Sequence, residues 1–292
     1  MSIELHCHTL FSIDAGGTPE NLVDVAATNG VSFLSITEHN HLGSCARGAA
    51  RAATHGITYI PGVELDTTFN NTWCHILGLG IDPANPILQQ VVTRNHDTYV
   101  HRFRSYYTIL RELGFQWTME DIEEGLPRYY PTHPSPIATF FAVRRFMHEQ
   151  GCGADFDAYH QTINARLAAT ERPPEEQFLD FETIFNAIHT AGGVVILAHV
   201  GHYFHQDIPA QVNFIRKIIA AGCDGFETHH FRNVAFSNID TLLELRSELN
   251  CLASGGSDCH HAPSSRPLGA SGITREIAKP LLERLLPTTA TP

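Results

Sequence analysis

The sequence predicts an α/β fold, built on a parallel sheet or barrel and interrupted by a mostly helical insertion. Short apolar runs alternate with amphipathic stretches in residues 1–99, and the same rhythm returns in residues 180–292. Such strand–helix–strand spacing is typical of βα units. From about Val100 to Leu179, long side chains and helix formers dominate, with a proline-rich stretch and an Arg-Pro-Pro break. We therefore expect one domain from 1–99 with 180–292, and a helical subdomain at 100–179.

The first part begins with a strand and a capped helix. Ile3–Leu5 forms the expected strand, and Thr18 is a candidate N-cap for a helix with Pro19 in its first turn. The elements expected next are strand Val31–Thr37, helix Ala46–His55, strand Ile57–Val63 and strand Trp73–Leu79. In the second part we expect helix Phe181–Ala191, strand Val194–Ala198, helix Gln211–Ala221, strand Asp224–Glu227, helix Ile239–Leu249 and strand Cys251–Ser254.

Composition and charge exclude several classes of protein. With 43% apolar and 17% charged residues, the chain has a globular balance, and no apolar run approaches the length of a membrane span. The N-terminus lacks the basic start and apolar stretch of a signal peptide, so we expect a cytoplasmic protein. A net charge of −12 argues against binding long nucleic acid. The 19 histidines are unusual, and histidine is a frequent metal ligand.

Ionisable side chains follow the expected strands. At or just beyond strand ends lie His6, His8, His39, Glu64, His75, His199, Glu227, Asp258 and His260. In a parallel α/β barrel the carboxyl ends of the strands meet on one face, so these residues would come together. Each alone has an ordinary explanation, such as a satisfied core histidine or a solvated carboxylate. All of them together predict a site for several cations, because polar groups gathered in a cleft need partners.

The ordered motifs resemble the PHP (polymerase and histidinol phosphatase) superfamily. These motifs are His6-Cys7-His8-Thr9 with Ser12 and Asp14, Thr37-Glu38-His39, Gly62-Val63-Glu64, His75, Ala198-His199-Val200 and Gly256-Ser257-Asp258-Cys259-His260. The resemblance implies a distorted (β/α)7 TIM-like barrel with two or three metal ions at the strand ends. It also implies a helical insertion, which we expect to contribute to the substrate pocket.

The resemblance also assigns metal ligands. By analogy, His6, His8, Glu64 and Asp258 would hold one ion, and Glu64 would bridge to a second ion held by His75 and His199. Asp14, His39 and His260 would hold a third. Mixed imidazole and carboxylate ligands suit manganese, which we expect first, or iron or zinc. A hydroxide bridging the metals would attack a phosphate ester, which makes the protein a hydrolase of phosphoric ester bonds with a small phosphorylated substrate.

Two departures from the family pattern lie next to proposed ligands, and a third concerns the substrate. The usual Thr-Asp-His-Asp is Thr37-Glu38-His39-Asn40, and the usual Ala-His-Pro is Ala198-His199-Val200. Nucleotide-processing relatives often carry an Arg-x-His pair in the insertion, whereas residues 130–138 contain no arginine. This favours a substrate other than a nucleoside 3′,5′-bisphosphate, such as a sugar phosphate or cyclic sugar phosphate, and histidinol phosphate also stays open because the whole superfamily shares the metal centre.

Other residues must then contact the substrate phosphate. The candidates are Arg128, His133, His202 and Arg232, of which His202 follows His199 most closely. Arg128 could instead be a solvated loop arginine, and Arg232 could equally be a charge at the start of a helix. We assign Glu64, Asp258 and His202 to catalysis. The general acid stays open among water, His202, Glu227 and His229.

Two other functions remain as alternatives. A metal-dependent amidohydrolase would cleave a C–N bond on a similar site, but such enzymes typically use a metal-bridging lysine. The chain has only Lys217 and Lys279, neither at an expected strand end. A non-catalytic metal-bound PHP module is the other alternative, although such modules tend to lose ligands and every ligand position is filled here.

Overall fold

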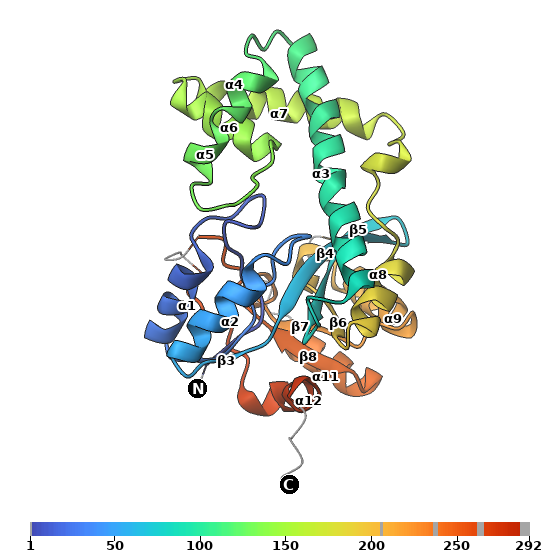
Figure 1. The fold of residues 1–292 in the computed structure, drawn as a ribbon. Helices are drawn as coiled ribbons and strands as arrows, with labels where there is room; N and C mark the ends of the chain where they lie inside the picture. Colours follow the sequence, from blue (N-terminus) through green and yellow to red (C-terminus); the bar gives the residue numbers. More distant parts are fainter. Residues whose placement is uncertain (1, 205–206, 236–238, 262–265, 287–292) are drawn as a thin grey trace. The chain divides into compact units, whose positions relative to one another are not determined.

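The computed structural model describes residues 2–204, 207–235, 239–261 and 266–286. The chain divides into two compact units, Met1–Thr93 with Leu179–Pro292, and Arg94–Phe178. The first unit combines the blue-to-teal and the yellow-to-red segments of Figure 1, so the two ends of the chain build one body.

The strands of the first unit form two sheets. A parallel three-stranded sheet has the order β1-β2-β3, and a five-stranded sheet has the order β4-β5-β6-β7-β8. The strands are β1 (Ser2–Glu4), β2 (Val31–Leu34), β3 (Thr58–Tyr59), β4 (Gly62–Phe69), β5 (Thr72–Leu79), β6 (Val194–Leu197), β7 (Gly225–His229) and β8 (Leu252–Gly255). The α/β class is therefore confirmed, whereas the described strands do not form one continuous closed ladder.

Isolated bridges join the two sheets on both sides. Beyond β1 and β8, Cys7 pairs with Cys259 in parallel, and the backbone N–H of His8 donates to the Cys259 carbonyl (2.9 Å). Beyond β2, His39 pairs with Glu64 of β4. Both bridges involve or flank residues expected in the site, so the backbone pairing between the two sheets holds the site residues in place.

The strand expected at Ile57–Val63 and its continuation differ from the prediction. It splits at Pro61, which has no N–H to donate to a ladder, and β4 then runs past Glu64 to Phe69. Asn70 and Asn71 turn the chain with positive φ values of 48° and 60°, and β5 returns antiparallel to β4. Glu64 and His75 thus lie inside two strands of a hairpin, and the expectation that they follow strand ends was wrong.

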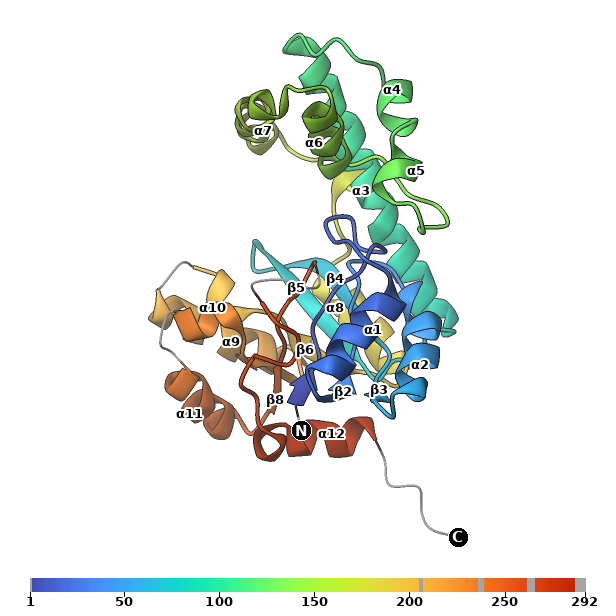
Figure 2. The same cartoon turned by 90° about the vertical axis from the view of Figure 1, so that its left-hand side faces the viewer.

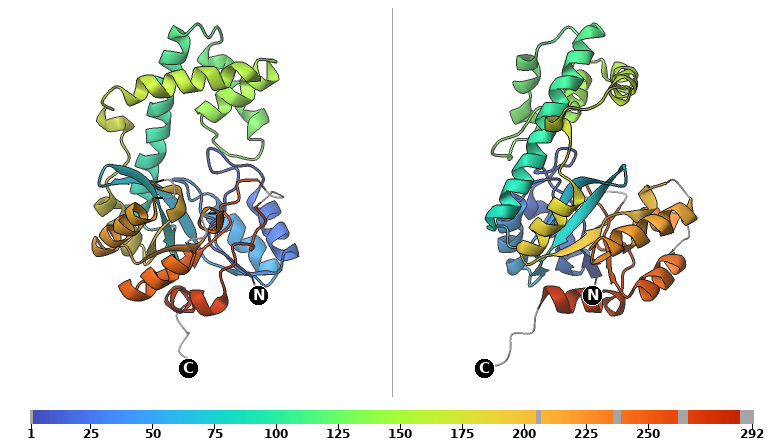
Figure 3. Two further views of the ribbon diagram at one scale, coloured as in Figure 1. Left: turned by 180° about the vertical axis from the view of Figure 1, so that it is seen from behind. Right: turned by 90° about the vertical axis from the view of Figure 1, so that its right-hand side faces the viewer.

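Helices cover the outer faces of these sheets. Thr18 caps α1 as expected, since its hydroxyl accepts from the Asn21 N–H (3.1 Å). Helices α1 and α2 lie side by side against β2 and β3 (Figure 2), whereas α9 and α11 pack together beside β7 (Figure 3). The helical segments are α1 (Pro19–Thr28), α2 (Ser44–Thr54), α8 (Phe181–Thr190), α9 (Ile208–Ala220), α10 (Phe231–Ala235), α11 (Ile239–Leu249), α12 (Arg275–Leu285) and the 3-10 turn η2 (Val200–His202).

The second unit is helical within its described residues. The long helix α3 (Pro86–Glu112) begins in the first unit, and α4 (Met119–Glu123), α5 (Leu126–Tyr129), α6 (Phe140–Glu149), α7 (Gly153–Ala168) and the 3-10 turn η1 (Pro174–Glu176) follow. It has a separate apolar core that includes Phe103, Leu110, Phe146 and Ile163. Among the described residues of the whole chain, no helix combines the length and apolarity that crossing a membrane requires.

Candidate metal centre

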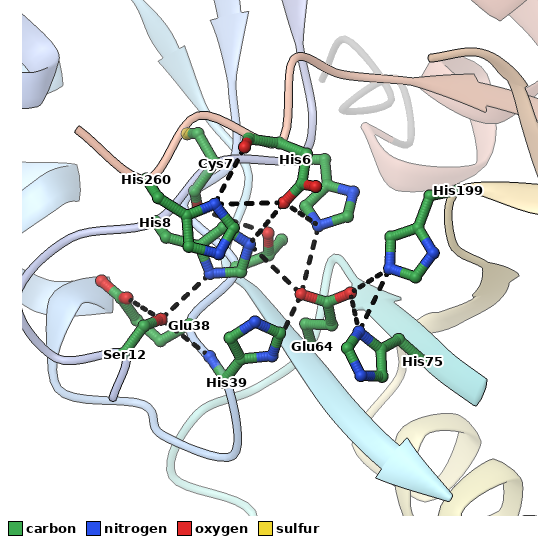
Figure 4. Close-up of polar contacts among 12 residues, drawn as sticks. His6, Cys7, His8, Ser12, Glu38, His39, Glu64, His75, His199 and His260 are labelled. Atoms are coloured by element: carbon green, nitrogen blue, oxygen red, sulfur yellow. Dashed lines mark hydrogen bonds and ion pairs between the residues drawn. The ribbon is translucent and has the colours of Figure 1, made fainter. Parts of the chain in front are cut away.

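Glu64 lies at the middle of the site and is fully buried. Its two carboxylate oxygens face imidazole nitrogens that come from four different segments of the chain (Figure 4). Oε2 lies near His6 Nε2 (3.2 Å), His8 Nε2 (3.2 Å) and His39 Nδ1 (3.3 Å), and Oε1 lies near His75 Nδ1 (2.9 Å) and His199 Nε2 (3.1 Å). One carboxylate therefore connects two groups of histidines.

Asp258 and Asp14 extend this arrangement. Asp258 Oδ1 lies 3.5 Å from His6 Nε2, 3.3 Å from His8 Nε2 and 3.4 Å from His260 Nδ1. Asp14 Oδ2 in turn lies 3.2 Å from His260 Nε2 and 3.7 Å from His39 Nε2. The structure thus brings together all nine residues that we expected as metal ligands, and we call this set the Glu64 centre.

Three of the histidines are held from behind. His6 Nδ1 pairs with Glu227 Oε1 (3.1 Å), and His75 Nε2 pairs with Asp66 Oδ1 (3.2 Å). A carboxylate on one ring nitrogen fixes the ring orientation and leaves the other nitrogen for a metal. Here the other nitrogen of each ring faces Glu64, which is the arrangement expected of metal-binding histidines.

A hydroxyl holds the third ring, and this involves the first departure from the family motif. His8 Nδ1 meets the Ser12 hydroxyl (3.0 Å), and that hydroxyl also contacts Glu38 Oε2 (2.6 Å) and the backbone N–H of His39 (2.9 Å). Glu38 is fully buried and also accepts from the Thr9 N–H (3.0 Å). Glu38 therefore links the two segments that carry His8 and His39.

Asn40, the other altered residue of the same motif, also has a clear role. Its φ of 46° lies in the left-handed region, which asparagine tolerates better than most residues. Its side-chain amide donates to Asp66 Oδ2 (2.5 Å), and its oxygen accepts from the Asp66 N–H (3.2 Å). An aspartate there would place a second negative charge against Asp66, whereas asparagine supplies a donor.

The backbone at the C-terminal motif is tightly packed against the N-terminal motif. A Cβ on Gly256 would lie 2.6 Å from the backbone nitrogen of His6, so only glycine fits. The buried Glu4 carboxylate accepts from the N–H groups of Ser257 (2.8 Å), Gly269 (2.8 Å) and His6 (3.2 Å). Glu4 therefore fastens the segments that carry His6 and Asp258 to each other.

The donor set fits metal ions. His8 Nε2 and His39 Nδ1 are buried and make no hydrogen bond, although carboxylate oxygens lie 3.2–3.3 Å away. Buried polar atoms without hydrogen bonds are costly unless another partner binds them. Three sets of potential ligand atoms converge among the expected residues: His6 with His8 and Glu64, His39 with Glu64 and His75, and His8 with His39 and His260. These sets support a centre for more than one ion.

Burial and the neighbouring carboxylates shift the pKa values of the histidines in opposite directions, and which of the two dominates differs from one histidine to the next. Burial lowers the pKa of His8, but Asp258 and Glu64 outweigh it and raise the pKa to about 9. Burial also lowers the pKa of His75, but the neighbouring Glu64 and Asp66 carboxylates outweigh it and raise the pKa to about 10. For His199 burial dominates and lowers the pKa to about 4. Burial raises the Glu64 pKa, but the surrounding histidines hold it well below its usual range.

These shifts predict proton release when metal binds. Metal ligation requires neutral imidazole, and at pH 7 the metal-free His6, His8 and His75 carry protons because nearby carboxylates raise their pKa values, to about 9 for His8 and about 10 for His75. We expect the release of about three protons per chain at pH 7, with less release and tighter binding as the pH rises toward 9. Calorimetric titration with Mn²⁺ in buffers of different ionisation enthalpy measures this. Release that does not change with pH would contradict the assignment.

The four substrate-contact candidates fall in both units. His202 and Arg232 belong to the first unit, on η2 and α10, which are linked by the Gly201 N–H donating to Asn233 Oδ1 (2.8 Å). The exposed His202 ring lies 5.5 Å from the His199 ring. In the second unit, Arg128 makes an exposed ion pair with Glu149 (3.0 Å), and burial lowers the pKa of His133 to about 4. Their contact with substrate stays a prediction.

Sequence reasoning missed several residues around the centre. Asp66 was not considered, although its i+2 spacing from Glu64 in one strand places both on one face. His230 was also missed; its Nε2 lies 3.6 Å from Asp258 Oδ2, and with His6 and Glu227 it forms a further convergent set. Glu227 was expected at a strand end near the site and was proposed as a candidate general acid, but not as a partner of His6. Burial raises its pKa, but His6, His230 and His199 outweigh this and lower it, so it serves better as an ionised partner of His6.

Comparison with known proteins gives the family. The model of the PHP domain matches residues 4–149, which is half of the chain. The chain belongs to the PHP family. This PHP chain is 28% identical to a 3′,5′-nucleoside bisphosphate phosphatase from Chromobacterium violaceum, over 97% of this chain and 96% of that protein. It is 26% identical to the 5′-3′ exoribonuclease Rnm of Escherichia coli, over 88% of this chain and 84% of that protein.

A solved structure supports the fold. The crystal structure of a proposed metal-dependent phosphoesterase from Bifidobacterium adolescentis superposes with a TM-score of 0.76 at 21% identity. The match covers 97% of this PHP chain and 96% of that chain. The relatives and this structure extend the similarity over nearly the whole chain, well beyond the residues that the family model matches.

Glu227, whose carboxylate contacts His6 from the side away from Glu64, offers a test of how the His6 ring is held. We expect Glu227→Gln to weaken metal binding by about 10–100-fold, because the amide holds His6 Nδ1 less firmly than the carboxylate does. Metal affinity is measured by competition with a chelating dye. Glu248→Gln, an exposed glutamate paired with Arg216, is the matched control and should bind metal like the unmodified protein. Equal affinity in both variants would show that Glu227 does not support the ligand.

Proposed function

We propose that this PHP phosphoesterase removes a phosphate group from nucleoside 3′,5′-bisphosphates, using two or three divalent metal ions held by the Glu64 centre. The observation that carries the proposal is the convergence of all nine expected ligands on one buried carboxylate and its neighbours. The nucleotide as substrate is supported by the bisphosphate phosphatase and the exoribonuclease, which match nearly all of the chain. We infer that the two isolated bridges between the sheets, Cys7–Cys259 and His39–Glu64, complete the distorted barrel that carries the centre.

The residues of the centre suit phosphate ester hydrolysis. Bound metal ions would supply an activated water and neutralise phosphate charge. Glu64 and Asp258 would share ions between the histidine groups, and Glu227, Asp66 and Ser12 would keep the rings oriented. His202 lies close to His199 and is exposed, so we assign it to the substrate phosphate rather than to a metal.

The amidohydrolase alternative finds no support in the centre. Lys217 lies on α9 and Lys279 lies on α12, where both side chains are exposed. A bridging lysine is therefore not part of this centre.

The substrate is tested by measuring phosphate release from a panel. Manganese-loaded protein is given nucleoside 3′,5′-bisphosphates, cyclic sugar phosphates, histidinol phosphate and simple sugar phosphates. The proposal expects the highest kcat/KM with the nucleoside bisphosphates. A clear preference for a sugar phosphate would instead favour the substrate that the missing insertion arginine indicates. No release from any compound, with metal bound, would support a non-catalytic module.

The role of His202 is tested by a separate substitution. We expect His202→Ala to raise KM by about tenfold while lowering kcat much less, because an imidazole that contacts the phosphate contributes mainly to binding. Steady-state kinetics on the preferred substrate separates the two constants. His148→Ala, which removes an exposed histidine on α6, is the control. An unchanged KM would remove His202 from the substrate site.

A further inference from the structure

Trp73 extends the row of side chains that leads outward from the Glu64 centre. In the β4–β5 hairpin, Asp66 pairs with His75 and Thr68 pairs with Trp73. Alternate residues of a strand share a face, so Trp73 and His75 point to the same side as Glu64 and Asp66. Two residues of a strand span about 7 Å, which places Trp73 one step beyond His75.

The Trp73 indole is exposed, yet it is held in place. It is 46% exposed, the highest value among the large hydrophobic side chains of the described residues. Its Nε1–H donates to Asp66 Oδ1 (2.8 Å), and its ring meets the His75 ring at 4.4 Å with an interplanar angle of 87°. The indole N–H is therefore already hydrogen-bonded to Asp66, while much of the aromatic surface remains exposed to solvent.

We propose that the Trp73 indole is a stacking platform for the base of a nucleotide whose phosphate lies at the Glu64 centre. This inference rests on the proposed function, and it adds the group that would select nucleotides over sugar phosphates. Every base has an aromatic face, so stacking on tryptophan recognises a nucleobase without reading its identity. A ring fixed before binding loses little entropy when the base stacks on it.

The position of Trp73 matches the length of a nucleoside phosphate. The phosphate and the base of such a molecule are separated by one ribose. His75 contacts both Glu64 and Trp73, so a single side chain separates Glu64 from the indole. The base would therefore reach the indole while the phosphate stays at the centre. A base-less sugar phosphate would leave the indole uncovered.

Kinetics on a matched pair of substrates tests the platform. The measured quantity is the ratio of kcat/KM for adenosine 3′,5′-bisphosphate to kcat/KM for ribose 3,5-bisphosphate. We expect Trp73→Ala to lower this ratio by about tenfold or more, mainly through KM for the nucleotide. Trp73→Phe keeps an aromatic face and should retain most of the preference. Ile87→Ala removes another exposed hydrophobic side chain, 43% exposed at the start of α3, and should leave the ratio unchanged.

The same variants separate stacking from a purely structural role. If Trp73 served only to orient Asp66 and His75 through its N–H, then Trp73→Phe and Trp73→Ala would be equally impaired on both substrates, and the proposal would be overturned. An unchanged ratio in Trp73→Ala would overturn it as well. Failure of the unmodified protein to hydrolyse any nucleotide would count against the proposed function instead, and a binding experiment then decides about Trp73.

Fluorescence provides that binding experiment without hydrolysis. The chain has two tryptophans, Trp73 and Trp117, so the Trp117→Phe protein reports on Trp73 alone. Titration of the metal-loaded variant with adenosine 5′-monophosphate should quench its emission saturably, because a stacked base contacts the indole directly. Ribose 5-phosphate should cause no comparable quenching. Equal responses to the two compounds, or none to either, would refute the platform.

Discussion

Replacing Glu64 with glutamine should reduce phosphate release by about 1,000-fold or more. Glu64 is buried and its two oxygens face five histidines, so it connects both groups of imidazoles in the centre. An amide has nearly the same shape but no charge, and it replaces one acceptor with a donor. A metal ion that Glu64 would help to hold contributes several kcal/mol of charge stabilisation, and a 1,000-fold loss corresponds to about 4 kcal/mol.

The Glu64 experiment needs both a metal measurement and a control. We expect Glu64→Gln to bind fewer metal ions per chain by elemental analysis, while circular dichroism shows that it is folded. Glu20→Gln removes a carboxylate that forms a partly exposed ion pair with Arg47 on the surface, and it should keep normal activity and metal content. A folded Glu64→Gln protein with near-normal activity would refute the centre as the catalytic site.

Removing metal should abolish activity completely and also destabilise the first unit. Without a cation, buried atoms such as His8 Nε2 and His39 Nδ1 keep no hydrogen bond. Ligands that bind only the folded chain stabilise it, so the chelated protein should unfold at a lower temperature. The measurement is phosphate release and thermal unfolding after treatment with a chelator, followed by addition of Mn²⁺, Fe²⁺ or Zn²⁺.

The outcome of chelation also identifies the effective ion. Recovery with one ion at more than one equivalent per chain would support a multinuclear centre and name the metal that serves it best. Full activity in protein shown to be free of metal would disprove metal dependence. Recovery at a single equivalent would support a mononuclear site and would leave the other convergent ligand sets without an ion of their own.

Most of the centre was predictable because its residues occur in short local motifs that resemble those of the PHP family. His-x-His near the N-terminus, Glu64, and Asp258-x-His260 are each ambiguous alone, but their order along the chain matches the family pattern. The alternation of strands and helices indicated an α/β domain in which these residues would meet, and all nine proposed ligands do lie together, although Glu64 and His75 lie inside strands and not beyond them. The Thr18 cap was also predictable, since capping depends on four consecutive residues.

Only the tertiary structure decided which partners stand behind these residues. Strand spacing puts Asp66 on the face of Glu64, and Glu227 was expected at a strand end, but nothing local pairs them with His75 and His6. Nothing in the sequence singles out His230 as a neighbour of Asp258. The reversal of β5 was hidden for the same reason. An apolar run such as Trp73–Leu79 predicts a strand but not its direction, which depends on the Asn70–Asn71 turn and on pairing with β6. Local spacing thus determined which residues could bind metal, whereas long-range backbone pairing determined how they are held and placed Trp73 beside them.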